Sequence, residues 1–190
     1  MTSSRIAAIP TQIETKRLIL RAFQDSDADP FHKAIEPALP NLRKWISSTV
    51  QENTLENQQV RIKKAHQDWT DGTRFNLLAI DKESGSIAGL VGVFNVNWTT
   101  KYGTIGVWFV PSFEGRGLAT EVGARLVDFA KDELGLDRIA WMCDVRNEKS
   151  ANVARKLGFH FEGVLRKEYL GPQGELTDTM VFSKVRGVEY

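Results

Sequence analysis

Two glycines flank Arg116 in the stretch FVPSFEGRGLATEV, which spans residues 109–122 and joins an apolar run to a segment with helical character. Glycines leave the neighbouring backbone N–H groups unshielded, and the start of a helix adds the positive end of its dipole. Because both features favour negative charge, this stretch is suited to bind an anion. A plain strand-to-helix turn explains it poorly, since glycine usually follows a helix rather than preceding it.

Two common phosphate-binding motifs do not fit this stretch. A loop of the Walker type requires G-x-x-x-x-G-K-[ST], which the sequence lacks. A dinucleotide fingerprint requires G-x-G-x-x-G, and Thr120 stands where the third glycine belongs after Gly115 and Gly117. Asp137 lies about twenty residues further on, as that fingerprint would need, but a broken fingerprint deep in the chain is weak evidence. The identity of the anion therefore depends on the rest of the sequence.

The composition is that of one ordinary globular domain, with 190 residues of which 42% are hydrophobic and 26% are charged. Lys and Arg number 25 against 24 Asp and Glu, which gives a formal net charge of +1. Proteins that bind nucleic acids or anionic membranes usually carry a clear basic excess. We therefore expect neither a nucleic acid nor a membrane as a partner.

Cysteine usage and the polar N-terminal residues predict a cytoplasmic protein. Cys143 is the only cysteine, which excludes an internal disulfide, and the start MTSSRIAAIPTQ lacks the apolar core of a secretory signal. No apolar run approaches the roughly 18 residues that a membrane-spanning helix needs. The three histidines show no metal-ligand spacing, so we expect no metal.

Hydrophobic periodicity predicts seven strands, at residues 17–23, 75–81, 86–97, 102–110, 138–145, 159–170 and 175–185. Five helices are expected between them. One begins near Pro30 after a cap at Asp25 or Asp27, and the others lie at 39–46, at about 53–69, between the glycine stretch and Gly135, and at 149–158.

The order of these elements predicts an α+β fold. A strand, a helix and a second strand between residues 104 and 145 require a parallel pair, because a crossover helix returns the chain in the same direction. The strands between 75 and 110 follow one another through short turns and form an antiparallel meander. The glycine stretch then lies at the carboxyl end of a parallel strand, which is where α/β proteins bind ligands.

The chain resembles the GCN5-related N-acetyltransferases (GNAT), and within that superfamily the Rim-type branch, which acetylates N-terminal amines of ribosomal proteins. TKRLILRAF resembles the first strand of the branch, LPNLRKWI its helix ending in tryptophan, GTIGVWFVPSFEGRGLATE its acetyl-CoA loop, VRNEKSANVARKLGF its Asn-containing helix start, and FEGVLRKEYL with a later Asp178 its closing hairpin. Glu114 departs from the pattern, because the superfamily usually has Gln or Arg there. A carboxylate beside a pyrophosphate must turn outward to be tolerated.

The resemblance implies a single N-acetyltransferase domain over residues 1–190, with residues 1–14 as an N-terminal extension. Its fold would be a mixed, largely antiparallel seven-stranded sheet flanked by helices, with acetyl-CoA held where the parallel strands 104–110 and 138–145 splay apart. The pyrophosphate would rest on the amides of Gly115, Arg116, Gly117, Leu118, Ala119 and Thr120. The pantetheine arm would pair with the backbone near Phe109 and Val110, and with the side chain of Asn147.

The resemblance also implies catalytic roles for two side chains. Ser150 matches a hydroxyl placed near the sulfur, where it can help the thiolate leave. Glu168 matches a carboxylate that takes the proton of the amine, directly or through water, with Glu162 as a less favoured substitute. On the sequence alone, Asn147 and Ser150 could equally cap the helix that follows them, and Glu168 could be a solvated strand residue.

Transfer in this superfamily is direct, in a ternary complex of enzyme, acetyl-CoA and amine, so Cys143 is not expected to act as a nucleophile. The developing oxyanion would meet a backbone N–H near Phe109 or Val110. An α-amino group has a pKa of about 7.7–8.0 and a lysine about 10.4, so deprotonating a lysine would cost about 3.4 kcal/mol more. Deprotonation of a protein N-terminal amine therefore requires only a modest base.

The expected acceptor is a protein N-terminal α-amine of the ribosomal-protein type. An alternative is a small primary amine such as a polyamine, an antibiotic or an amino acid. A further alternative is a regulator that binds CoA without turnover, although the presence of both Ser150 and Glu168 argues against it. Exposed strand edges, and the dimerisation that the resemblance to the family implies, are compatible with a homodimer.

Overall fold

The structure is a computed structural model that describes residues 6, 8–45, 52–171 and 174–190. Within these residues, eight strands form one sheet in the order β1-β2-β3-β4-β5-β6-β8-β7, and every neighbouring pair except β5 and β6 is antiparallel. The strands are β1 (Gln12–Glu14), β2 (Leu18–Ala22), β3 (Phe75–Asp81), β4 (Ile87–Asn97), β5 (Tyr102–Phe109), β6 (Arg138–Asp144), β7 (His160–Leu170) and β8 (Leu176–Val185). This arrangement confirms the predicted α+β fold with one parallel pair.

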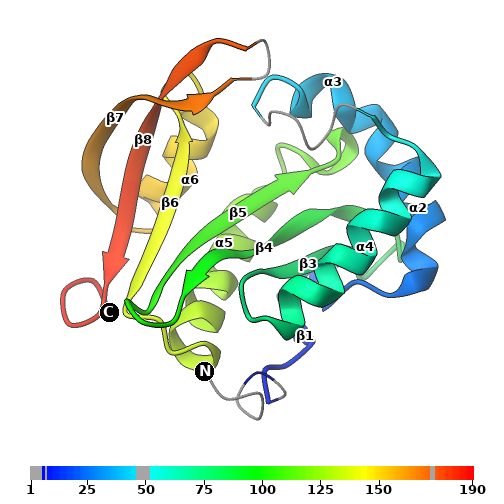
Figure 1. Cartoon of the computed structure of the whole chain (residues 1–190), viewed down its shortest axis with the longest axis horizontal. Coiled ribbons are helices and arrows are strands. Elements are labelled where there is room, and N and C mark those ends of the chain that lie inside the picture. Colours follow the sequence, from blue (N-terminus) through cyan, green and yellow to red (C-terminus); the bar gives the residue numbers. More distant parts are fainter. Residues whose placement is uncertain (1–5, 7, 46–51, 172–173) are drawn as a thin grey trace.

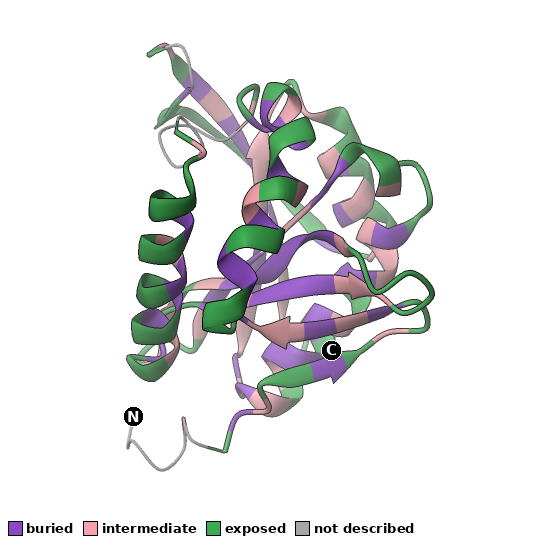
Figure 2. Cartoon of the chain, turned by 90° about the vertical axis from the view of Figure 1, so that its right-hand side faces the viewer, coloured by how far each residue is buried: buried purple, intermediate pink, exposed green. Residues whose placement is uncertain are grey.

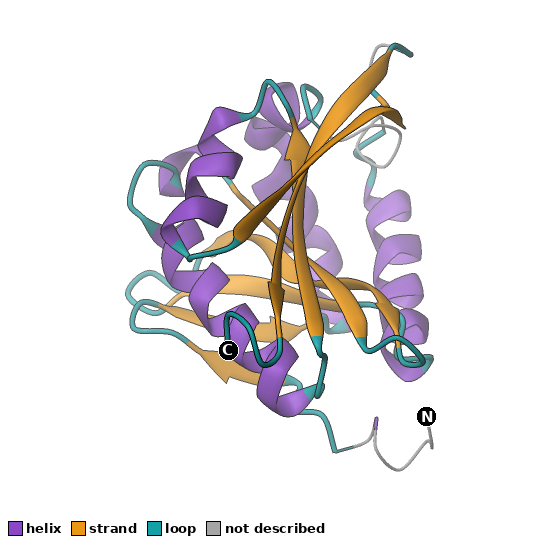
Figure 3. Cartoon of the chain, turned by 90° about the vertical axis from the view of Figure 1, so that its left-hand side faces the viewer, coloured by secondary structure: helices purple, strands orange, loops and turns teal. Residues whose placement is uncertain are grey.

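Helices cover both faces of the sheet, as Figures 1 and 3 show. They are α2 (Ala28–Ile35), α3 (Leu39–Leu42), α4 (Leu55–Thr70), α5 (Leu118–Asp128) and α6 (Glu148–Lys156). A short 3₁₀ turn precedes α2, and a π-helical turn at Phe129–Glu133 extends α5. The sheet therefore has two packed faces, each with its own apolar core.

We call the first of these the α4 face. Its core joins Leu78, Leu90 and Val110 of the sheet region to Phe31 of α2 and Ile62 of α4. The residues of α4 that are buried recur every three to four positions, so the helix turns one side to the sheet and exposes the other (Figure 2).

The opposite side of the sheet is the α5 face. Val93 and Ile105 of the central strands pack there with Val122 and Leu126 of α5 and with Trp141 of β6. All five are at most 3% exposed, so α5 is anchored firmly beside the strands on either side of it in the sequence. This anchoring fixes where α5 begins, immediately after the glycine stretch.

Several sequence expectations are corrected in detail. The sheet has eight strands rather than seven, because Gln12–Glu14, within the segment taken as an extension, pairs with β2. The predicted helix at 39–46 is helical over Leu39–Leu42 only, and its last residue, 46, lies outside the described residues. The Asp27 side chain does not cap α2 but accepts two hydrogen bonds of 2.7 Å from Arg21 and one from the Gln24 amide. A buried carboxylate satisfied in this way ties β2 to the start of α2.

Candidate active site

The parallel strands β5 and β6 separate at their carboxyl ends. Their pairing runs only from Tyr102–Ile105 on β5 to Arg138–Trp141 on β6, although both strands continue beyond it. Beyond the pairing, β5 remains bonded to β4 as far as Phe109, and β6 remains bonded to β8 as far as Asp144. Because each strand follows a different neighbour, a gap opens between them, which is visible in Figure 1 as a widening wedge.

The backbone of β5 offers one predicted amide to this gap and not the other. The Val110 N–H donates to the Ala88 carbonyl oxygen at 2.8 Å, so it is directed toward β4. Successive residues of a strand direct their N–H groups to opposite sides. The Phe109 N–H is therefore directed toward the gap, and of the two amides considered for the oxyanion only that of Phe109 has the required direction.

The glycine stretch presents a row of amides without acceptors. Six consecutive N–H groups, from Gly115 to Thr120, donate to no acceptor in the described part of the chain. Gly115 has φ 74° and Gly117, the N-cap of α5, has φ 75°, a left-handed conformation that other residues rarely adopt. Amides that gather in this way at a helix N-terminus form a site for phosphate. The residues therefore fit the pyrophosphate of acetyl-CoA.

Arg17 holds this loop in place, and sequence reasoning missed it. Its Nη1 donates to the Arg116 carbonyl oxygen at 2.9 Å, and its Nε donates to Glu121 of α5 at 2.7 Å. The Arg17 backbone N–H donates to the same carboxylate at 2.9 Å. Arg17 directly precedes β2 and lies about a hundred residues from its partners in sequence. No local pattern could have indicated the contact.

Glu114, the departure from the family pattern, turns away from the amides. Its carboxylate accepts a hydrogen bond of 2.9 Å from Asn41 Nδ2 on α3. The neighbouring Arg116 places its guanidinium 5.0 Å from the centre of the Phe113 ring. The carboxylate thus lies toward α3. This is the orientation expected of a carboxylate if a phosphate binds at the neighbouring amides.

Ser150 and Asn147 lie together at the start of α6, on the α5 face. The Asn147 side-chain oxygen accepts from the Ser150 N–H at 3.1 Å, so it caps the helix, while its Nδ2 donates to no acceptor among the described residues. Trp141 Nε1 donates to Ser150 Oγ at 2.9 Å. The helix-capping alternative is thus correct for Asn147, whose Nδ2 remains available for a ligand, whereas Ser150 lies between Trp141 and Cys143.

Cys143 lies beside Ser150 but is poorly suited to nucleophilic attack. Burial raises the pKa of its thiol, and a hydrogen bond with Ser150 only partly offsets this effect. A thiol with a raised pKa carries little thiolate at neutral pH. The electrostatics therefore agree with the expectation that Cys143 takes no covalent part.

Glu168 sits in a bulge of β7. Leu165 pairs with Thr179 and Tyr169 with Thr177, so four steps along β7 match two along β8. Within the bulge Lys167 has φ 51°, and its N–H donates to Asp178 Oδ1 at 2.8 Å. Bulges commonly re-aim side chains next to active sites.

The bulge places Glu168, which is exposed, over β8. Thr179 Oγ1 donates to Glu168 Oε2 at 3.0 Å. Thr179 pairs with Asp144, which lies three residues beyond Trp141 on β6. Because side chains alternate along a strand and Trp141 belongs to the α5 face, Thr179 and the Glu168 carboxylate lie on the α4 face. Ser150 and Glu168 are therefore at the same end of β6 but on opposite faces of the sheet.

Glu162, the substitute base, is already engaged elsewhere. Hydrogen bonds from the Arg138 guanidinium, one of them 2.7 Å long, and from Ser183 lower the pKa of Glu162 to about 2. A carboxylate with so low a pKa is a weak proton acceptor near neutrality. This geometry favours Glu168 over Glu162.

No group of three or more His, Cys, Asp or Glu side chains in the described ranges is arranged to hold a metal ion. Among the same residues, no helix combines the length and apolar character needed to cross a membrane.

Comparisons with known proteins identify the family of the chain. The acetyltransferase (GNAT) domain family matches residues 17–160. YdaF of Bacillus subtilis, which carries the name of a ribosomal N-acetyltransferase, is 27% identical over 157 residues, or 80% of this chain and 82% of YdaF. Spermidine N(1)-acetyltransferase of Escherichia coli is 33% identical over 85 residues, or 45% of this chain and 46% of that enzyme.

A solved structure supports the same assignment. The Microcin C7 self-immunity acetyltransferase MccE, in complex with acetyl-CoA and AMP, matches with a TM-score of 0.84 at 25% identity, over 93% of this chain and 97% of MccE. The family match covers most of the chain, and the unbonded amides lie inside it. The chain therefore belongs to the GNAT acetyltransferase family and is an acetyl-CoA-dependent N-acetyltransferase.

Proposed function

We propose that this enzyme acetylates the N-terminal α-amine of a protein, of the ribosomal-protein type, by direct attack in a ternary complex. The observation that carries the proposal is the setting of Glu168. Its carboxylate is aimed onto the α4 face by the bulge, is bonded to the neutral Thr179, and makes no ion pair within the described residues. A carboxylate in this position can accept the proton of an α-amine, whose deprotonation costs about 3.4 kcal/mol less than that of a lysine.

The proposed division of labour follows from the two faces of the sheet. Acetyl-CoA supplies the acetyl thioester, with its phosphates on the amides of residues 115–120 and its arm at Asn147 Nδ2 and the gap. The Phe109 N–H stabilises negative charge on the carbonyl oxygen. Glu168 accepts the amine proton from the α4 face, while Ser150, whose oxygen is oriented by Trp141, donates a hydrogen bond to the departing thiolate on the α5 face, which then takes its proton from water.

A thiol-release assay against a panel of acceptors tests the proposal. The panel contains N-terminal peptides, polyamines, aminoglycosides and free amino acids, and CoA binding is measured in parallel. Activity on peptides alone supports the proposal, and activity on a small amine alone establishes the alternative that the match to spermidine N(1)-acetyltransferase favours. Retained CoA binding with no turnover on any acceptor would indicate a regulator.

Glu168→Gln is expected to slow turnover most at low pH. The variant cannot take the amine proton, so the reaction depends on amine that has already lost it, and this fraction grows toward the α-amine pKa of about 7.7–8.0. The rate should therefore recover partly between pH 6 and 9, measured on one acceptor peptide.

Glu162→Gln is the matched control, because Glu162 is a glutamate of the same strand whose carboxylate is bonded to Arg138 and Ser183. It should keep the wild-type pH profile. A Glu168→Gln enzyme with the wild-type rate throughout this range would remove Glu168 from the mechanism.

A further inference from the structure

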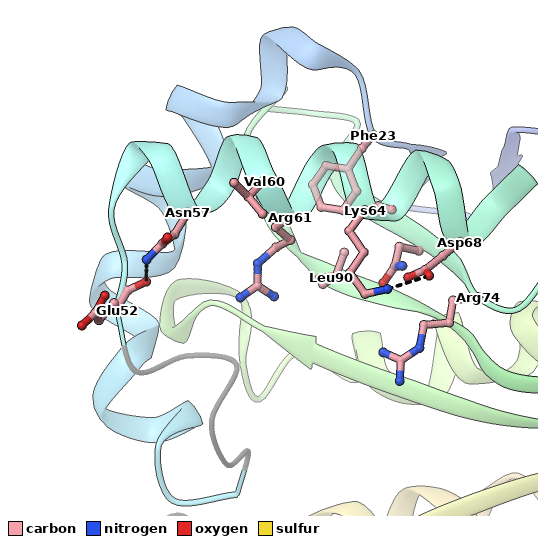
Figure 4. Close-up of a pocket in the computed structure, with 11 residues that line it drawn as sticks. Phe23, Glu52, Asn57, Val60, Arg61, Lys64, Asp68, Arg74 and Leu90 are labelled. Carbon is pink, nitrogen blue, oxygen red and sulfur yellow. Dashed lines mark hydrogen bonds and ion pairs between the residues drawn. The ribbon is translucent and has the colours of Figure 1, made fainter.

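A pocket of about 450 Å³ lies on the α4 face, between α4 and strands β3 and β4. Three cations line it, Arg61 and Lys64 from α4 and Arg74 from the residue before β3, and Figure 4 shows their side chains extending over the sheet. Phe23 and Leu90 add apolar surface. The pocket can thus accommodate a chain that has both apolar and charged groups.

The pocket is on the acceptor side of the gap. Leu90 pairs across the β4–β5 ladder with Trp108, and Trp108 belongs to the part of β5 that has separated from β6. Residues paired across a ladder share a face, so the pocket lies on the same face as the Glu168 carboxylate. A substrate whose amine reaches the gap from this side would extend toward the pocket.

The charges of the pocket leave a positive excess. Lys64 Nζ lies 3.0 Å from Asp68 Oδ1, so these two charges offset each other. Arg74 makes no ion pair in the described ranges, and its guanidinium lies 6.0 Å from the centre of the Phe94 ring. Glu52, the remaining carboxylate of the lining, lies at the opposite end of α4 from Arg74, as Figure 4 shows.

Arg61 is less exposed than the other two cations of the pocket. Burial lowers the pKa of its guanidinium, although an arginine remains protonated in proteins. Guanidinium groups bind carboxylates and phosphates with two parallel hydrogen bonds, which adds geometric selectivity.

We propose that this pocket binds a carboxylate or phosphate on the acceptor, and that the enzyme therefore selects N-terminal peptides with Asp or Glu shortly after the first residue. The inference rests on the proposed function, because it assigns the acceptor to the α4 face. A polyamine or aminoglycoside would bring positive charge to a positive pocket and is disfavoured by the same electrostatics.

The test compares two N-terminal peptides that are identical except at positions two to six. One peptide carries Asp and Glu there, and the other carries Asn and Gln. Wild-type enzyme is expected to show a kcat/KM about tenfold higher for the acidic peptide, mostly through KM and falling with added salt. In Arg74→Gln this ratio should fall toward one. Lys63→Gln is the matched control, because it removes the same charge from α4 outside the pocket lining, and it should keep the wild-type ratio.

The outcomes separate this inference from the proposed function. Equal use of both peptides by the wild-type enzyme, or the same ratio in Arg74→Gln, would overturn the anion site while leaving α-amine acetylation intact. If peptides are inert, small primary amines with and without a carboxylate or phosphate are compared with spermidine. Preference for the anionic amine would support the pocket and refute the peptide acceptor, whereas preference for spermidine would refute both.

Discussion

Gly117→Val is expected to abolish measurable acetyl-CoA binding while the protein remains folded. Gly117 has φ 75° and is the N-cap of α5, in the middle of the row of unbonded amides. A β-branched residue in the left-handed region costs about 1–3 kcal/mol, so the loop should relax and turn its amides away from a common centre. Calorimetric titration with acetyl-CoA measures the loss, and circular dichroism verifies the fold.

Gly187→Val serves as the control for strain alone. Gly187 has φ 80° and open space around the Cβ position, and it lies in the turn after β8. The Gly187→Val variant should lose about as much free energy of unfolding as Gly117→Val and keep its acetyl-CoA affinity. Unchanged affinity in Gly117→Val would mean that residues 115–120 are only a turn.

Ser150→Ala is expected to lower kcat by about 10²- to 10⁴-fold with little change in CoA affinity. The variant loses the hydrogen-bond donor to the departing thiolate, and that range spans the losses typical for such donors and for general acids. Because the effect is on a step after binding, kcat and kcat/KM should fall together. Single-turnover kinetics on an acceptor peptide, combined with CoA titration, separate the two effects.

Cys143→Ser tests whether the effect belongs to the Ser150 proton or to its surroundings. Cys143 hydrogen-bonds Ser150 without a proposed chemical step of its own, so its replacement should leave kcat within a fewfold of the wild type. A Ser150→Ala enzyme that fails only in cofactor binding would return Ser150 to a structural role as part of the helix start.

Local chemistry explains why much of the site is predictable from the sequence. The glycines at 115 and 117 indicate positive φ angles, and the periodicity of α5 predicts a helix N-terminus directly after them. The strand, helix and strand order then dictates a parallel pair. Each of these inferences depends on residues that are close together in the sequence.

The features that sequence reasoning missed depend on contacts between distant segments. The three-residue strand β1 is too short for a periodic signal and exists because β2 offers a free edge. The hydrogen bonds of Arg17 to the loop join residues about a hundred positions apart. The bulge at Glu168 follows from the register between β7 and β8, which no single strand specifies.

A crystal structure with bound CoA tests the central claim most directly. It should place the pyrophosphate within hydrogen-bonding distance, about 2.7–3.2 Å, of amides between Gly115 and Thr120. The pantetheine arm should pass through the gap between β5 and β6, with the sulfur near Ser150 Oγ on the α5 face and Glu168 on the other side. A CoA molecule whose phosphates lie away from residues 115–120, or whose arm does not enter the gap, would contradict the account.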